Sequence, residues 1–257
     1  GNIDTNGFDA TLTGQAFGGG RLVKKGTGAL TLTGSNSYSG GTLVSGGALA
    51  VSSDGNLGTG GLTLDGGALK TLGNVSSSRA VTLGAGGGTV DTDVFTSTLS
   101  GPVDGGGRLT VAGAGKLSLT GANAYSGGTT ISGGSSLSIA SDAALGDVNG
   151  GVTFDNGTLQ WLGTFDLAST RAITLNAGGG TVDTNGFDTG IQQTIGGAGR
   201  LTKSGAGTLY LAPGNTYTGG TTINGGTISI GVNTALGDAT GGLTFNGGTL
   251  RTTADIS

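Results

Sequence analysis

Aspartates at alternate positions are the side chains in this sequence best suited to chemistry. Asp91 and Asp93 are two residues apart, so in a strand they share one face. Such a carboxylate pair could bind Ca²⁺ or carry out acid–base chemistry on a glycan. The matching pairs in the chain are Asp4 with Asn6 and Asp183 with Asn185. Because the second carboxylate is an amide in both, and the chain contains no Glu to close a calcium loop, we interpret these segments as solvated turns.

A second candidate site is the string Asn-x-Tyr-x-Gly-Gly, which occurs three times. Tyrosines along one edge could stack on sugar rings. In the interpretation that we favour, Asn bonds the turn backbone, Tyr packs over the neighbouring coil and Gly-Gly makes the bend. The copies would lie four coils apart, so their tyrosines would be roughly 19 Å from one another and form no continuous track. We predict structural turns at Asn36, Tyr38, Gly40, Gly41, Asn123, Tyr125, Gly127, Gly128, Asn215, Tyr217, Gly219 and Gly220.

Composition excludes several other kinds of site. The sequence has no His and no Cys, so His-based triads, thiolate metal sites and disulfides are impossible. A formal net charge of −4 argues against nucleic-acid partners. The glycine run Gly18–Gly20 is followed by neither a helix nor Gly-Lys-Ser/Thr, so it does not match a phosphate-binding loop. We therefore predict no catalytic residue, no cofactor and no metal, and we expect a protein that is not an enzyme.

An internal repeat organises the chain. Arg21, Arg108 and Arg200 begin matching stretches at spacings of 87 and 92 residues. We predict a single domain made of a partial unit 1–17, complete units 18–104 and 105–196, and a partial unit 197–257. The start of the chain lacks the features of a signal peptide, and no stretch approaches the roughly 18 apolar residues of a membrane span. We expect a segment of a longer protein that does not itself insert into a membrane.

Short strands separated by glycine turns are the local pattern within each unit. Leu30 with Leu32 and Leu49 with Val51 show the two-residue alternation of a half-buried strand, and no window has a sustained helical period. The 61 glycines fit turns between such strands. Strands this short cannot bury an apolar face alone, so the repeat favours coils stacked along an axis. We predict an all-β solenoid with almost no helix and about eleven or twelve coils, about 55 Å long.

The third copy of the motif, residues 197–226, closely resembles the passenger-associated transport repeat. Its pattern is Gly-x-Gly-x-Leu-x-Lys-x-Gly-x-Gly-Thr-Leu-x-Leu-x-x-x-Asn-x-Tyr-x-Gly-Gly-Thr-x-Ile-x-x-Gly. The other copies depart from it at Ala29 and Val44 and at Val111 and Lys116, outside the turn positions. The resemblance implies a right-handed parallel β-helix from an autotransporter passenger of a Gram-negative bacterium. It also implies export to the cell surface through the chain's own C-terminal β-barrel, with the repeats helping secretion.

Our leading hypothesis is a non-catalytic stalk that aids secretion and presents or mediates adhesion. Expected partners are further copies of the chain through self-association, and a host surface or glycan through other regions of the protein. One alternative is a β-helix enzyme or lectin acting on polysaccharide, which would need clustered Asp or Arg on neighbouring coils. Another is an ice- or crystal-surface binder with Thr-x-Thr ranks. Thr31 and Thr33 fit such a rank, but Ala50 and Asp65 interrupt it, so we expect no regular rank.

Overall fold

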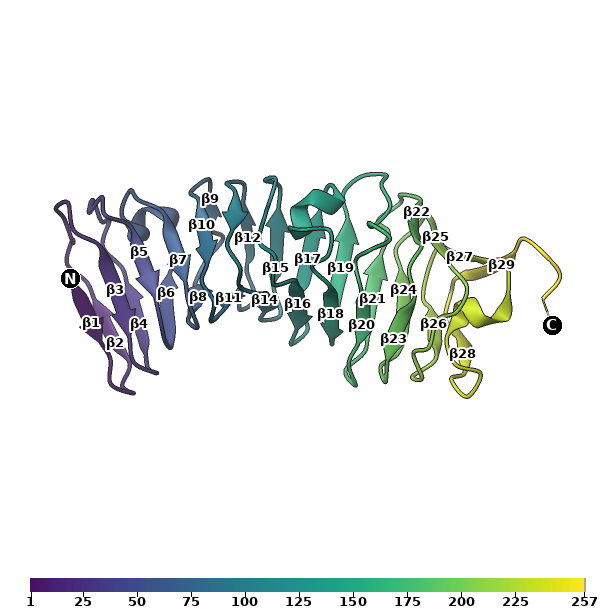
Figure 1. Ribbon diagram of the computed structural model, residues 1–257. Coiled ribbons are helices and arrows are strands. Elements are labelled where there is room, and N and C mark those ends of the chain that lie inside the picture. Colours follow the sequence, from purple (N-terminus) through teal and green to yellow (C-terminus); the bar gives the residue numbers. More distant parts are fainter. Residues whose placement is uncertain (257) are drawn as a thin grey trace.

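The computed structural model, which describes residues 1–256, is an elongated stack of parallel strands with the two termini at opposite ends (Figure 1). It forms a β-solenoid of about 12 turns, which confirms the predicted fold class and number of coils. Strands in successive coils pair in parallel about 20 residues apart, as Val23, Leu43 and Thr63 do. No helix within residues 1–256 has the length and apolar character needed to cross a membrane.

Four sheets run along the stack. Sheet A contains β1 (Asn2–Asp4), β3 (Leu22–Lys25), β5 (Thr42–Val44), β7 (Leu62–Leu64), β10 (Val81–Leu83) and β13 (Val103–Asp104). Sheet B contains β2 (Ala10–Leu12), β4 (Ala29–Leu32), β6 (Ala48–Val51), β8 (Ala68–Thr71), β11 (Gly88–Asp91), β14 (Leu109–Ala112), β16 (Thr129–Ser132), β18 (Val152–Asp155), β20 (Ile173–Leu175) and β23 (Ile195–Gly197).

The remaining strands form sheets C and D. Sheet C contains β9 (Ser76–Ser77), β12 (Thr96–Leu99), β15 (Lys116–Leu119), β17 (Ser136–Ile139), β19 (Gly157–Trp161), β21 (Gly180–Asp183), β24 (Leu201–Ser204), β26 (Thr221–Ile223) and β28 (Leu243–Phe245). Sheet D contains β22 (Thr189–Ile191), β25 (Thr208–Leu211), β27 (Thr227–Ile230) and β29 (Thr249–Thr252). Among residues 1–256 the helical structure consists of three 3₁₀ turns, η1 (Asp54–Leu57), η2 (Asp142–Leu145) and η3 (Asn233–Leu236).

Each coil has three sides. The first side carries sheet A and later sheet D, the second carries sheet B and the third carries sheet C. Between β13 and β22 the first side continues as irregular backbone that is still hydrogen-bonded from coil to coil. The Ala124 amide donates to the Val103 carbonyl at 2.8 Å, and the Asp147 amide donates to the Tyr125 carbonyl at 3.0 Å. Sheets A and D therefore lie on one side of the stack.

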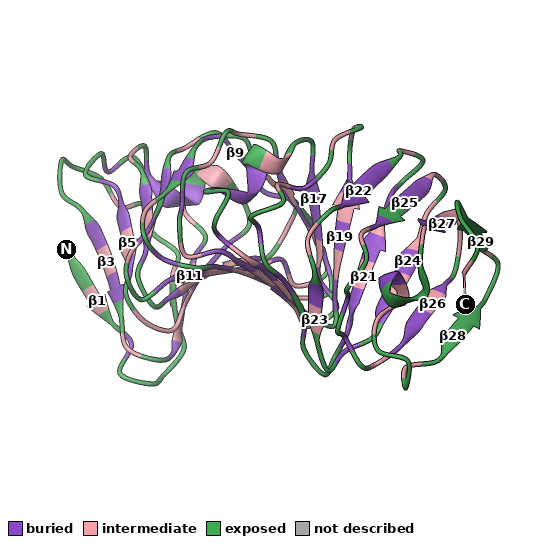
Figure 2. Ribbon diagram, turned by 45° about the vertical axis from the view of Figure 1, so that its right-hand side comes forward, coloured by how far each residue is buried: buried purple, intermediate pink, exposed green. Residues whose placement is uncertain are grey.

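The core runs along the axis and is built from the apolar positions of the alternating strands. Leu30, Leu49 and Leu69 pair in register in successive coils, and none exposes more than 2% of its surface. Figure 2 shows the same alternation as buried and exposed bands along the strands of a curved stack. Each such side chain contributes about 1.5–3 kcal/mol through burial. The alternation is lost in β28, where Leu243 and Phe245 are both exposed.

Successive copies of the repeated motif lie on different sides of the solenoid. The first copy forms β3 and β4 in sheets A and B, and the second forms β14 and β15 in sheets B and C. The third copy forms β24 and β25 in sheets C and D. The copies are therefore more than the predicted four coils apart and do not lie along one edge. Units of 87 and 92 residues are longer than four coils of about 20, so each copy advances by one further side.

Candidate functional site

The three Asn-x-Tyr strings lie on the side of each unit that lacks a regular strand, beside a 3₁₀ turn. Tyr38, Tyr125 and Tyr217 are buried, with at most 3% of their surface exposed. Each phenol is hydrogen-bonded to the hydroxyl of the threonine four residues later, at 2.7, 2.7 and 2.6 Å respectively. Burial raises the pKa of Tyr125 and of Tyr217 to about 12. These rings are in the interior and are not available to stack on a ligand.

The asparagine of each string connects three coils. In the second copy the Asn123 side-chain oxygen accepts the Val103 amide at 2.9 Å, and its Nδ2 donates to the Ala144 carbonyl at 2.6 Å. In the third copy Asn215 makes the same two bonds, to the Ile195 amide at 2.8 Å and the Ala235 carbonyl at 2.7 Å. The primary amide suits this position because it offers an acceptor and a donor at once.

The paired aspartate positions form Asx turns. The amide two residues later donates to the Asp4, Asp91 or Asp183 carboxylate at 2.9, 2.8 and 2.9 Å. Asn6, Asp93 and Asn185 have the positive φ values of 45°, 50° and 50° that such turns favour. Lys70 lies 3.8 Å from Asp91 and 3.6 Å from Asp93. Within residues 1–256 no group of three or more Asp side chains is placed to hold a metal ion.

Two structural arginines, Arg171 and Arg79, were not identified from the sequence, and the second of them is half-buried. Arg171 is fully buried, and it binds both carboxylate oxygens of Asp142, each at 2.9 Å, and the Gly150 carbonyl at 2.6 Å. Arg79 donates from Nε to one carboxylate oxygen of Asp54 at 2.8 Å and from Nη2 to the Asp54 backbone carbonyl at 3.0 Å. Both arginines hold a 3₁₀ turn of the preceding coil. The signal in the sequence is the string Arg-Ala-Val/Ile-Thr-Leu, which recurs at a spacing of 92 residues.

Lys24 and Lys203 are also buried. The Lys203 ammonium donates to the carbonyls of Ser204, Gly205 and Gly225 at 2.7, 2.8 and 3.2 Å, and Lys24 makes the corresponding three bonds. Burial lowers the pKa of Lys203 to about 8. All three N–H donors of each ammonium bond to backbone carbonyls of two coils, so neither lysine has a free donor for a ligand.

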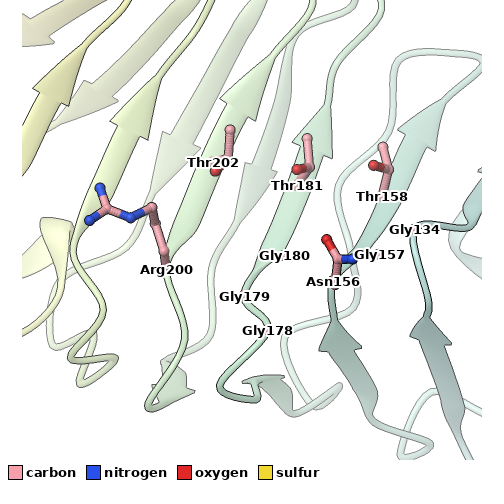
Figure 3. Close-up of a pocket in the computed structure, with 10 residues that line it drawn as sticks. All are labelled: Gly134, Asn156, Gly157, Thr158, Gly178, Gly179, Gly180, Thr181, Arg200 and Thr202. Carbon is pink, nitrogen blue, oxygen red and sulfur yellow. The ribbon is translucent and has the colours of Figure 1, made fainter.

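A polar groove of about 230 Å³ lies at the corner between sheets B and C (Figure 3). Its floor is backbone, and Thr158, Thr181 and Thr202 stand along one wall in register. Its lining residues are Gly134, Asn156, Gly157, Thr158, Gly178, Gly179, Gly180, Thr181, Arg200 and Thr202. A smaller groove of about 160 Å³ is lined by Gly66, Gly67, Gly86, Gly87, Gly88, Thr89, Arg108 and Thr110, between sheets A and B.

Single threonines form two regular ranks on the outer surface, although they do not form the Thr-x-Thr pairs considered from the sequence. Five pair in register along sheet B, namely Thr89, Thr110, Thr130, Thr153 and Thr174. Five more do so along sheet C, namely Thr158, Thr181, Thr202, Thr222 and Thr244. The row that contains Thr31 is interrupted at Ala50, as predicted, and Asp65 follows a strand of sheet A on another side.

Comparison with known proteins identifies the repeat. The passenger-associated-transport-repeat matches residues 22–51, 109–138 and 201–230. The chain is 39% identical over 251 aligned residues to the adhesin BmaC autotransporter of Brucella suis biovar 1 (strain 1330). That alignment covers 84% of this chain and 7% of the relative, so the chain spans a small fraction of the relative's length. No solved structure matches the chain significantly.

Proposed function

The chain belongs to the passenger domains of autotransporters, and from this premise we propose that it is a non-catalytic stalk. In this proposal the segment aids secretion, stands at the bacterial surface, and presents or mediates adhesion and self-association. The observation that supports the stalk most directly is the uninterrupted coil-to-coil pairing from β1 to β29, with a continuous apolar core. Such a stack can grow one coil at a time, because each coil contacts only its neighbours.

The secretion role rests on this sequential assembly. Each coil that emerges at the surface would find a completed template and bury apolar side chains against it, which favours forward movement of the chain. The 87- and 92-residue units are, in our proposal, the repeated modules of this process. The relative's description as an adhesin supports an adhesive role at the surface for the protein to which this segment belongs.

A non-catalytic role agrees with the use of the reactive side chains. The buried Tyr, Lys and Arg side chains bond to neighbouring residues in the stack, and the paired aspartates cap turns.

Self-association is the part of this proposal that a direct measurement can test. Sedimentation of the purified segment over a concentration series should show reversible association, and the threonine ranks on sheets B and C are the surfaces we assign to such contact. Replacing Thr110, Thr130 and Thr153 together with lysine should abolish association that uses sheet B. A matched triple variant at Thr181, Thr202 and Thr222 tests sheet C. Strictly monomeric behaviour at high concentration would contradict self-association and leave only the stalk and secretion roles.

A further inference from the structure

The two grooves are copies of one structure. Gly86–Gly88, Thr89, Arg108 and Thr110 of the smaller groove correspond to Gly178–Gly180, Thr181, Arg200 and Thr202 of the larger one, at a constant offset of 92 residues. Because the motif advances by one side per unit, the first groove lies between sheets A and B and the second between sheets B and C. The same lining is thus presented twice, in two directions.

The floor of each groove has no room for side chains. A Cβ at Gly178 would lie 2.6 Å from Oδ1 of Asp155, and one at Gly179 would lie 2.8 Å from the Arg200 carbonyl. Gly179 also has φ of +71°, which L-residues with side chains rarely adopt. Close packing of the coils therefore explains why glycine occupies these positions. It does not explain the polar side chains that surround them.

The threonine wall offers unused hydrogen-bonding groups. Within residues 1–256 the hydroxyls of Thr158, Thr181 and Thr202 have no hydrogen-bond partner, and the same is true of Thr89 and Thr110 in the smaller groove. These side chains are half-buried. A ligand in the groove could therefore bond to them without displacing any contact within the protein.

The arginine beside each groove is exposed and has no acidic partner among residues 1–256. Arg200 donates from Nη1 to the Thr222 hydroxyl at 2.8 Å, and Arg108 donates in the same way to Thr130 at 3.1 Å. No carboxylate in that range lies within ion-pair distance of either guanidinium. Figure 3 shows Arg200 directed along the outer surface toward the next coil, away from Asn156. Each guanidinium is therefore held in place by one hydroxyl, with its remaining donors free.

We propose that each groove binds one acidic unit of a polysaccharide, with Arg108 or Arg200 holding its carboxylate or sulfate. A guanidinium binds either anion through paired hydrogen bonds, and the threonine hydroxyls suit the hydroxyl groups of a sugar ring. A peptide would find little in this lining for its apolar side chains. The inference rests on the adhesive part of the proposed function and assigns a glycan to this segment itself. The grooves lie on different edges, so they bind separate chains and not one chain along its length.

The test is a titration of the ¹⁵N-labelled segment with a hyaluronan octasaccharide, which carries carboxylates, and with a heparin octasaccharide, which adds sulfates. The amide signals of Gly86–Gly88 and Gly178–Gly180 should shift together with one or both ligands. A neutral chitin hexasaccharide should leave them unchanged. The double variant Arg108→Gln/Arg200→Gln should bind roughly tenfold more weakly, as expected for the loss of a charge-assisted bond. Arg108→Lys/Arg200→Lys, which keeps the charge, should lose less.

Arg251→Gln is the matched control, because Arg251 is also exposed but lies in β29, away from both grooves. Equal weakening by this variant, or shifts outside the two grooves only, would overturn the proposal. So would the absence of binding to both acidic oligosaccharides. Sedimentation without glycan reports self-association separately, so failure of the groove proposal does not count against the stalk. The far-ultraviolet circular dichroism of each variant should match that of the parent.

Discussion

At the residue scale, the position of the buried lysine differs between two copies of the motif, and the neighbouring backbone carbonyls receive different donors. In the third copy of the motif the Lys203 ammonium satisfies three carbonyls. In the second copy the corresponding residue is Val111. The Gly-Gly turn of the next coil, at Gly133 and Gly134, is one residue longer there than the matching turn at Gly225 and Gly226. The extra residue, Ser135, is buried, and its hydroxyl donates to the Val111 carbonyl at 3.0 Å. The valine and the extra serine thus occur in the same copy, although Ser135 bonds to the Val111 carbonyl and Lys203 bonds to the carbonyls of other residues.

This co-occurrence predicts a rescue. Lys203→Val should lower the free energy of unfolding by about 1–3 kcal/mol, because carbonyls left buried without a donor carry their desolvation penalty. Inserting one serine between Gly226 and Thr227 in that variant should recover part of the loss by reproducing the second copy. Urea unfolding of the parent and the two variants measures both effects. If the insertion lowers stability further, the proposed equivalence of the two copies is wrong.

The buried tyrosines predict sensitivity to alkali. Burial raises the pKa of Tyr125 and Tyr217 from 10.0 to about 12, so their stabilising contribution is complete below pH 10. It should decline as the pH rises from 10 toward 12, because the unfolded chain loses these protons first. Unfolding free energies measured across this range should fall. The double variant Tyr125→Phe/Tyr217→Phe should show a shallower fall, and an unchanged slope would contradict this assignment.

At the scale of elements, Arg79 and Arg171, which we call the arginine clamps, attach η1 and η2 to the following coil. Arg171 is fully buried and its partner Asp142 is 17% exposed, whereas Asp54, the partner of Arg79, is 36% exposed. Arg171→Met should destabilise the fold by about 3–5 kcal/mol, because it leaves a carboxylate and several carbonyls without their donor. Arg79→Met should cost less, since water can reach Asp54. Thermal unfolding of both variants tests this order, and the reverse order would refute the argument from burial.

Two glycines with positive φ, Gly128 in a Gly-Gly bend and Gly186 in an Asn-Gly turn, should differ in the cost of adding a side chain. Gly128 has φ of +77°, and a Cβ there would lie 2.6 Å from the Gly151 carbonyl oxygen. Gly186 has φ of +93°, but a Cβ there would have no heavy atom within 4 Å. Gly186→Ala should cost about 1–2 kcal/mol from backbone strain alone. Gly128→Ala should exceed that value by about 1–3 kcal/mol from overpacking. Equal losses, measured by urea unfolding, would show that the close approach is relieved at no cost.

The strands could be predicted from the sequence because their alternation is local. Leu30 and Leu32, for example, are buried, as the period of two requires. The side of the solenoid on which each strand lies could not be predicted in the same way. It depends on the summed length of every preceding turn, so Thr31 and Thr63 lie on different sides although their strands show the same alternation. The Arg171 clamp was missed for a related reason, since Asp142 is 29 residues away along the chain.

At the scale of the whole molecule, each unit is rotated about the solenoid axis by one of its three sides relative to the unit before it. The features that recur with the motif, namely the tyrosine corner, the 3₁₀ turn and the groove, appear on successive sides. A surface with this symmetry presents its features in several directions. That arrangement suits contact with several partners at once more than tight binding of one flat object. The stability of the stack should still depend on neighbouring coils alone.

Deleting one whole unit tests this view of the molecule. Removing residues 105–196 joins Asp104 to Gly197, which occupies the same environment as Gly105. The Gly107 amide donates to the Leu83 carbonyl at 3.2 Å, and the Gly199 amide donates to the Leu175 carbonyl at 2.9 Å, 92 residues further on. The shortened chain should therefore fold, with its C-terminal part turned by one side, and be about 20 Å shorter by small-angle scattering.

The matched control adds Gly197→Val to the same deletion. Gly197 has φ of +112°, and a Cβ there would collide with the carbonyl of the coil beneath, so a β-branched residue cannot replace it without strain. The deletion variant should unfold in one cooperative transition, and the control should lose that cooperativity or unfold at a lower urea concentration. If the simple deletion gives an unfolded chain, the units are not interchangeable. The coils would then depend on contacts beyond their neighbours, and sequential assembly during secretion would lose its physical basis.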